Sequence, residues 1–204
     1  MSPEVEALHD RVRAYLQKSA DLKREVAEKC LDSVVSAAGL IAEAFRSGGK
    51  VLLCGNGGSA ADCQHMAAEF VSVLSQDFKR PGLPAIALTT DTSFLTAYSN
   101  DFGYEGIFER QVQALGRSGD VLVGISTSGN SANVVRAVGA AQTAGMRTLV
   151  LTGNGGRLPG MADVAISVPS TDTQHIQEMH LAIEHVICEL VERQLFPGEV
   201  GRGA

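Results

Sequence analysis

One stretch, residues 51–70, constrains the fold of this chain more than any other. An apolar run, Val51 to Cys54, is followed by Gly-Asn-Gly-Gly, which predicts a short buried strand and a sharp turn. Ser59 is expected to cap the helix that follows, whose free N–H groups attract an anion. His65 and Glu69 lie four residues apart in this helix and therefore on one face. The stretch predicts an anion site beside a reactive His/Glu pair, although a purely structural pair is the alternative.

Composition narrows the class of protein. The chain has 204 residues, enough for one α/β domain, and its 5% aromatic content with no Trp suits an aliphatic core. The net charge of −6, with no Lys/Arg cluster, makes nucleic acid or an anionic membrane an unlikely partner. We see no signal peptide and no apolar run of about eighteen residues, so we expect a cytoplasmic protein. The four scattered cysteines predict reduced thiols, with a Cys54–Cys63 or zinc-thiolate site as the less favoured alternative.

Further apolar runs alternate with helical patterns along the chain. Strands are predicted at 85–88, 120–125, 147–152 and 163–168, and helices at 92–98, 104–115, 132–144 and 173–195, with 100–103 as a helix break. Because the runs are continuously apolar, we expect a five-stranded, mostly parallel sheet covered by helices on both faces, a flavodoxin-like αβα sandwich.

Two helices are predicted before the first strand, at about 3–18 and 21–46. Their narrow apolar stripes indicate packing either on a partner subunit or on the core. We therefore expect a single domain over 1–204, with N-terminal helices in 1–48, the αβα core in 49–196 and a flexible tail in 197–204.

The loops after the strands are expected to converge, because ligands of parallel sheets bind at the carboxyl ends of the strands. Residues 126–131 read Ser-Thr-Ser-Gly-Asn-Ser and precede a helix, so they offer uncharged donors suited to a phosphate monoester. A solvated loop with a good cap is the alternative. Three other motifs are incomplete in this sequence. A dinucleotide-binding site would need an acidic residue after the next strand, and a P-loop would need Gly-Lys-Ser/Thr. A serine-hydrolase nucleophile elbow would need a second Gly.

Four motifs together resemble the phosphoheptose isomerases of the SIS (sugar isomerase) family. They are Cys-Gly-Asn-Gly-Gly-Ser (54–59), Ser-Asn-Asp-Phe-Gly (99–103), Gly-Ile-Ser-Thr-Ser-Gly-Asn-Ser (124–131) and Ile-Gln-Glu-Met-His (176–180). The likeness covers nearly the whole chain and both leading helices. It implies an isomerase that converts sedoheptulose 7-phosphate to D-glycero-D-manno-heptose 7-phosphate, the first step of heptose biosynthesis for lipopolysaccharide core or surface glycans. It also implies a homotetramer with active sites between subunits, and zinc.

The resemblance also assigns residues. The substrate contacts that it implies are Asn56, Gly57, Gly58, Ser59, Asn100, Asp101, Ser126, Thr127, Ser128, Ser131 and Gln177. The implied metal ligands are His65, Glu69, Gln177 and His185, with Glu69 and His185 also the acid/base pair. Two positions depart from the family pattern: Val73 and His175 stand where relatives usually have Arg, which removes two positive charges near the site.

The chemistry of the residues agrees with this assignment. Ketose–aldose isomerisation through an enediol needs a base, an acid and a stabiliser for the developing oxyanion, which a carboxylate, an imidazole and Zn²⁺ can supply. One feature does not agree with it. Gln177 and His185 are eight residues apart, about 12 Å of helix rise, so one ion could join them only from a position between them, or with Gln177 in a looser first turn.

A second function remains open at this level. Some SIS proteins are non-enzymatic partners of the bacterial replication initiator, and by resemblance they lack the equivalents of Glu69 and His185, which this chain has. Other polar residues of the last helix are expected to be structural: Glu178 and Glu184 as solvated charges, and His180 as a packed or capping histidine.

Overall fold

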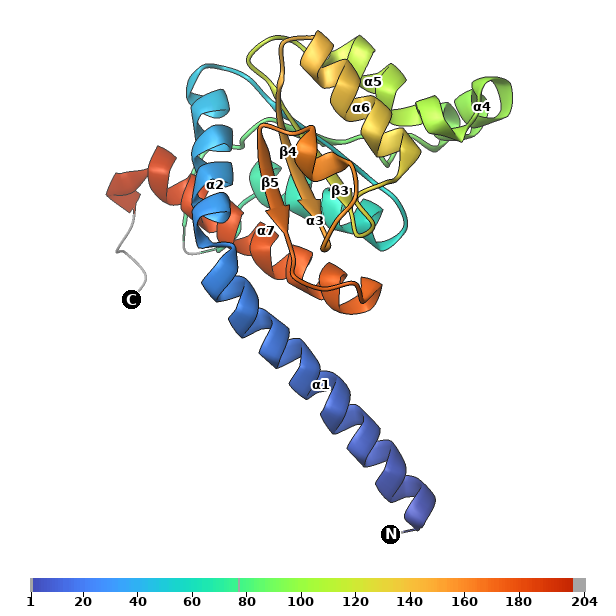
Figure 1. Cartoon of the computed structure of the whole chain (residues 1–204). Coiled ribbons are helices and arrows are strands. Elements are labelled where there is room, and N and C mark those ends of the chain that lie inside the picture. The colour runs from blue at the N-terminus through green and yellow to red at the C-terminus, as the bar shows by residue number, and fades with distance from the viewer. Residues whose placement is uncertain (1, 77, 200–204) are drawn as a thin grey trace.

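The fold is a five-stranded parallel sheet between two layers of helices, seen in a computed structural model that describes residues 2–76 and 78–199 (Figure 1). The strands lie in the order β2-β1-β3-β4-β5 and every neighbouring pair is parallel. They are β1 (Val51–Gly55), β2 (Ala85–Ala87), β3 (Val121–Ser126), β4 (Arg147–Thr152) and β5 (Val164–Ser167). The predicted α/β class and the five strands are confirmed.

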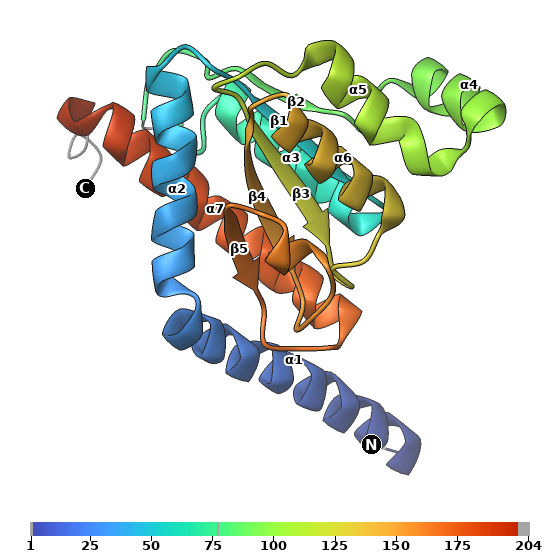
Figure 2. The ribbon, with the colours of Figure 1, turned by 45° about the horizontal axis from the view of Figure 1, so that its top comes forward.

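Helices cover both faces of the sheet (Figure 2). One face packs against α2 (Leu31–Arg46), α3 (Gly58–Val71) and α7 (Thr173–Leu195). The other packs against α5 (Ile107–Leu115) and α6 (Ala132–Thr143). Within β1, Val51 and Leu53 enter the first core and Leu52 and Cys54 the second, because successive strand side chains point to opposite faces. Burial on both faces explains the continuous apolar runs.

The N-terminal part differs from the prediction. The first helix was predicted to end near residue 20, but α1 (Pro3–Lys29) continues without a break to Lys29. The chain bends at Cys30 before α2 begins. The intervening residues are strong helix formers, and Lys29 pairs with Glu25 one turn back, so nothing there ends the helix. In Figures 1 and 2, α1 extends well beyond the body of the domain. Leu22 is its one buried side chain, whereas α2 belongs to the core.

A second boundary was also predicted wrongly. The helix break predicted at 100–103 begins only at Gly103, because α4 (Thr92–Phe102) includes Asn100 and Asp101 in its last turn. The helix ends at Gly103, whose φ of 93° is costly for other residues. A 3₁₀ turn, η1 (Tyr104–Gly106), then leads into α5. Other 3₁₀ turns are η2 (Leu158–Gly160) and η3 (Pro197–Glu199).

Two further predictions concern the C-terminal tail and membrane spans. The flexible tail was predicted for 197–204; its first three residues form η3, and residues 200–204 lie outside the described residues. Across the part of the chain that the structure describes, none of the helices is long and apolar enough to cross a membrane.

Candidate active site

The strand order places a topological switch point at the carboxyl ends of β1 and β3. From β1 the chain crosses to β2 on one side, and β3 then pairs with the other side of β1. The loops that leave β1 and β3 therefore diverge, and such a switch point is where open parallel sheets bind ligands. The two loops in question are the Gly-Asn-Gly-Gly turn and the Ser/Thr-rich loop.

The turn after β1 depends on glycine. Gly57 has φ 57° and ψ −121°, a conformation that L-residues avoid, and it is also the N-cap of α3. A Cβ on Gly58 would collide with the amide group of Gln177, so the first turn of α7 lies directly over this loop. Ser59 is not the cap that we predicted. It lies inside the first turn of α3 and is buried.

Helices α3 and α7 run side by side in the same direction. Near their N-termini, the side-chain amide of Gln177 lies against Gly58. Two turns further along, His185 meets His65. The stretch from Gln177 to His185 on α7 thus runs alongside the stretch from Gly58 to His65 on α3.

Three side chains gather where these helices meet: His65 and Glu69 from α3, and His185 from α7. The Nε2 atoms of the two histidines are 2.7 Å apart, and Nε2 of His65 lies 3.5 Å from Oε1 of Glu69. One ligand atom from each residue lies within 4.8 Å of the others. The two histidines and the carboxylate are partly accessible, so a small molecule can reach them.

Two imidazoles and a carboxylate form a donor set that Zn²⁺ uses in catalytic sites, where a further position stays open. The residues present therefore fit a divalent metal. Gln177, the fourth ligand implied by resemblance, has its amide against Gly58 instead, at the loop end of the same helix pair.

Hydroxyl groups cluster in the loop after β3. The side chains of Ser126 and Ser131 share a hydrogen bond of 2.9 Å, and those of Ser126 and Ser128 approach to 3.4 Å. The backbone N–H of Asn130 donates to Oγ of Ser128, and Gly129 turns the loop with φ 65°. The loop leads directly into α6, so its hydroxyls and the first N–H groups of that helix are neutral donors of the kind that bind anions. Thr127 is half-buried, and its carbonyl accepts from the N–H of Gly153.

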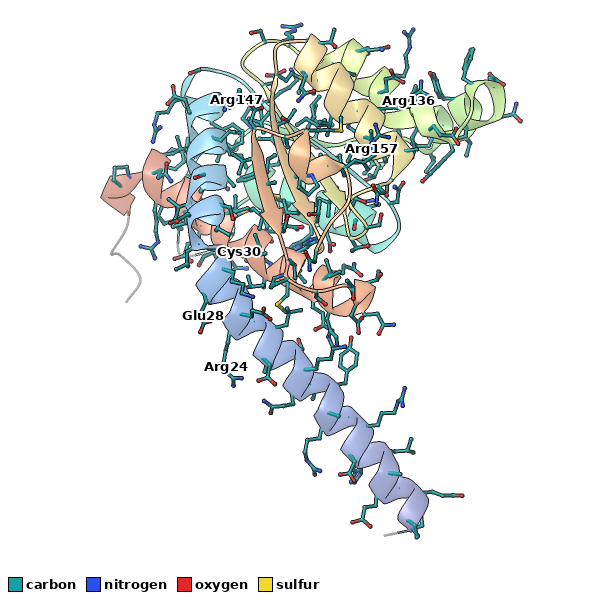
Figure 3. The ribbon with its side chains drawn as sticks, in the orientation of Figure 1. Arg24, Glu28, Cys30, Arg136, Arg147 and Arg157 are labelled. Atoms are coloured by element: carbon teal, nitrogen blue, oxygen red, sulfur yellow. The ribbon has the colours of Figure 1, made fainter. Side chains whose placement is uncertain are left out.

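Among the described residues, no arginine side chain hydrogen-bonds this loop. Arg157 joins it through the backbone, because its N–H donates to the carbonyl of Gly129 and to Oδ1 of Asn130. Arg147 lies at the amino end of β4, away from the loops, and pairs with Asp163 (Figure 3).

The segment 99–104 reaches the first loop through a tyrosine. Asn100 and Asp101 are exposed and hydrogen-bond each other at 2.8 Å. Just beyond them, the hydroxyl of Tyr104 donates to Oδ1 of Asn56 at 2.8 Å. The structure therefore places this motif beside the turn after β1, although the contacts of Asn100 and Asp101 are with each other.

The charged residues of α7 are not solvated as predicted. Glu184 is buried, and its two carboxyl oxygens have no hydrogen-bond partner. Burial, reinforced by the negative charge of Asp62, raises the pKa of Glu184 to about 9. Glu178 is half-buried, because Tyr15 and Ser19 of α1 both donate hydrogen bonds to it. A helix-period pattern cannot reveal these environments, since they depend on which helix packs alongside.

Two histidines of α7, His175 and His180, are buried in the protein interior. His180 is buried, as predicted, and its Nε2 lies 3.1 Å from the carbonyl of Thr152 at the end of β4. Burial lowers the pKa of His180 to about 4. His175, which departs from the family pattern, is buried against the ring of Tyr15, with ring centroids 4.3 Å apart. It thus contacts α1 rather than the loops after β1 and β3.

Arg80 has a structural role that the sequence does not reveal. Its buried guanidinium donates to the carbonyls of Glu69 and Phe70 at the end of α3, and pairs with Glu192 at 2.7 Å. It therefore satisfies free carbonyls of the helix that carries Glu69. A single basic residue in a Pro/Gly-rich segment gives no signal of this role.

Comparisons with known proteins agree with this geometry. The SIS domain family matches residues 14–153. The phosphoheptose isomerase of Roseiflexus sp. is 56% identical over 182 residues, covering 89% of this chain and 91% of the relative. That of Aquifex aeolicus is 51% identical over 187 residues, covering 91% and 97%.

Solved structures of phosphoheptose isomerases also resemble this chain. The phosphoheptose isomerase of Neisseria gonorrhoeae aligns with a TM-score of 0.85 at 47% identity, covering 90% of this chain and 98% of that one. The enzyme of Francisella tularensis gives a TM-score of 0.86 at 38% identity, covering 90% and 97%. These relatives favour an enzyme over the non-enzymatic replication-initiator partner. The chain belongs to the SIS-domain family, and within it to the phosphoheptose isomerases.

Proposed function

We propose that this protein isomerises sedoheptulose 7-phosphate to D-glycero-D-manno-heptose 7-phosphate, the first step of heptose biosynthesis for lipopolysaccharide core or surface glycans. The cluster of His65, Glu69 and His185 carries the proposal, because it brings a carboxylate and imidazoles together beside the switch point of the sheet. The names of the relatives, each a phosphoheptose isomerase, supply the substrate class.

Glu69 and His185 move the protons in this proposal. Glu69 takes a proton from C1 of the ketose while His185 gives one to the C2 oxygen, which forms the enediol. The O1 hydroxyl then returns a proton to His185, and Glu69 delivers its proton to C2, which leaves an aldehyde at C1. One base and one acid suffice, because Glu69 returns the proton that it takes and His185 regains the proton that it gives.

Zinc is the proposed cofactor. His65, Glu69 and His185 would hold it, with Gln177 as a fourth ligand if its amide leaves Gly58. When bound, zinc supplies polarisation of the substrate oxygens. A ligand role weakens the basicity of Glu69, so we propose that its metal-binding and proton-accepting roles alternate.

The phosphate is proposed to bind the hydroxyl loop. Neutral donors and a helix N-terminus hold a phosphate monoester without the affinity of an arginine cluster, which suits a substrate that must leave again. The proposed contacts are Ser126, Thr127, Ser128 and Ser131 for the phosphate, and Asn56, Gly57, Gly58, Ser59, Asn100, Asp101 and Gln177 for the sugar.

A homotetramer with active sites between subunits is proposed for the assembly. The support is the apolar stripe on α1, where Val5, Leu8, Val12 and Leu16 are 40–62% exposed on a helix that extends from the domain. A second copy of the chain is the natural cover for such a stripe, so residues 1–48 are proposed to serve in packing.

The four cysteines are free, which suits the reducing cytoplasm.

The test is direct. Purified protein is incubated with sedoheptulose 7-phosphate, and the aldose phosphate is followed by NMR. We expect its signals to appear and to require Glu69. An inactive wild type that instead binds a replication initiator would replace the enzyme with the binding module.

A further inference from the structure

Two asparagines form a reciprocal pair between the loops after β1 and β3. Nδ2 of Asn56 donates to Oδ1 of Asn133 at 2.9 Å, and Nδ2 of Asn133 donates to Oδ1 of Asn56 at 2.8 Å. Asn133 lies in the first turn of α6, two residues after Ser131, and is buried. The pair therefore joins the proposed sugar-binding turn to the proposed phosphate loop.

The orientation of this pair is fixed from the Asn133 side. The backbone N–H of Val134 donates to Oδ1 of Asn133 at 3.0 Å, so that atom must be the amide oxygen. Because Asn133 cannot exchange its oxygen and nitrogen without losing this bond, Asn56 must present its own oxygen to Nδ2 of Asn133.

Tyr104 completes the arrangement. Its hydroxyl donates to Oδ1 of Asn56, and that oxygen then has two donors for its two lone pairs. One of the two N–H bonds of Asn56 is also in use, toward Asn133. What remains of the Asn56 amide is a single N–H.

We propose that Asn133 and Tyr104 are positioning residues that hold Asn56 as a pure hydrogen-bond donor toward an oxygen of the substrate. The substrate atom must then be an acceptor, a carbonyl or hydroxyl oxygen of the phosphosugar. Since Asn133 also follows the phosphate loop, the pair fixes how far this N–H lies from the phosphate. The inference rests on the proposed function and adds one detail to it, namely that Asn56 donates, and the substrate accepts, the hydrogen bond between them.

Tyr104→Phe is the principal test, because Tyr104 is exposed and the ring is kept. Losing one neutral hydrogen bond should raise KM for sedoheptulose 7-phosphate by about 3- to 10-fold, with kcat and Tm close to wild type. Tyr98→Phe on α4 is the matched control and should leave KM unchanged. A Tyr104→Phe variant with wild-type KM overturns the proposal.

A double-mutant cycle separates positioning from direct contact. If Tyr104 acts through Asn56, adding Tyr104→Phe to Asn56→Ala should change KM by less than about 2-fold. Effects that multiply independently overturn the proposal. Asn56→Asp, which offers lone pairs in place of the N–H, should bind the substrate more weakly than Asn56→Ala, and equal or tighter binding contradicts a donor role.

Asn133→Ser addresses the buried partner, with Tm measured alongside. We expect a KM increase at least as large as that of Tyr104→Phe, and an unchanged KM in a folded variant argues against the pair. A wild type with no activity on sedoheptulose 7-phosphate removes the proposed function, and this inference with it. An active wild type with unaffected variants removes the inference alone.

Discussion

Nε2 of His65 and Nε2 of His185 lie 2.7 Å apart, although 120 residues separate them in the chain. At this distance one nitrogen must donate and the other accept, since two protonated rings would repel each other. The carboxylate of Glu69 approaches the same nitrogen of His65 to 3.5 Å. The position between these atoms is thus suited to a proton or a metal ion, and the reaction proposed here uses that property.

Glu69→Gln tests the carboxylate as a proton acceptor. The amide keeps the shape and an oxygen ligand but cannot take a proton, so kcat should fall by about 10²- to 10⁴-fold. His185→Gln should have a similar effect. Both side chains are partly exposed, so Tm should change little, as differential scanning calorimetry can verify. Glu189→Gln on the exposed side of α7 is the control. Wild-type turnover in Glu69→Gln would make the carboxylate structural.

Chelation tests the metal. We expect zinc to co-purify, to be removed by EDTA with loss of activity, and to restore activity when added back. His65→Ala should retain less metal than wild type at equal protein concentration, measured by elemental analysis. Full activity in EDTA, with no zinc found, would leave Glu69 and His185 as a metal-free pair.

Ser128→Ala tests the phosphate loop. Ser128 is exposed, and its hydroxyl accepts from the N–H of Asn130 at 3.2 Å. Removing one hydrogen bond to a charged group costs about 1.5–3 kcal/mol, so KM should rise by roughly 10- to 150-fold in steady-state assays. Ser36→Ala, at an exposed hydroxyl of α2, serves as the control. An unchanged KM would move the phosphate to another loop.

The sequence was informative where local pattern decides structure. Continuous apolar runs predicted the parallel sheet, and the i, i+4 spacing of His65 and Glu69 predicted their shared face, which the 3.5 Å contact confirms. It was less informative where packing between helices decides. The burial of Glu184 depends on α3 lying alongside α7, and the link from Tyr104 to Asn56 joins two segments of no common motif. The helix boundary at Cys30 was misplaced because no Gly or Pro marks it.

Arg80→Ala tests the support beneath Glu69. The guanidinium pairs with buried Glu192 and holds two carbonyls of α3, so its loss leaves the buried carboxylate without its charged partner. Breaking such a pair typically costs about 3–5 kcal/mol, and we expect that loss in urea unfolding. Replacing both partners, Arg80→Met with Glu192→Met, should recover much of it. Equal losses in the single and double variants would contradict the ion-pair explanation.

Glu184→Gln tests the buried carboxyl group of α7 through the pH dependence of stability. Burial and the charge of Asp62 raise the pKa of Glu184 to about 9, against 4.5 in the unfolded chain. Between these values the unfolded chain has released a proton that the folded protein keeps, so the free energy of unfolding falls as pH rises. The slope from this group is at most about 1.4 kcal/mol per pH unit and ends above pH 9.

The measurement is urea unfolding of wild type and Glu184→Gln at pH 7.0 and 8.5, in EDTA to exclude metal linkage. This window avoids His180, whose lowered pKa of about 4 acts with the opposite sign in acid. Burial also raises the pKa of Asp62, and that cause is common to wild type and variant. The stability of the variant relative to wild type should therefore increase with pH. Glu189→Gln, on the exposed side of the same helix, should follow the wild-type curve. Parallel curves for Glu184→Gln and wild type would mean that Glu184 is solvated or paired in the folded protein.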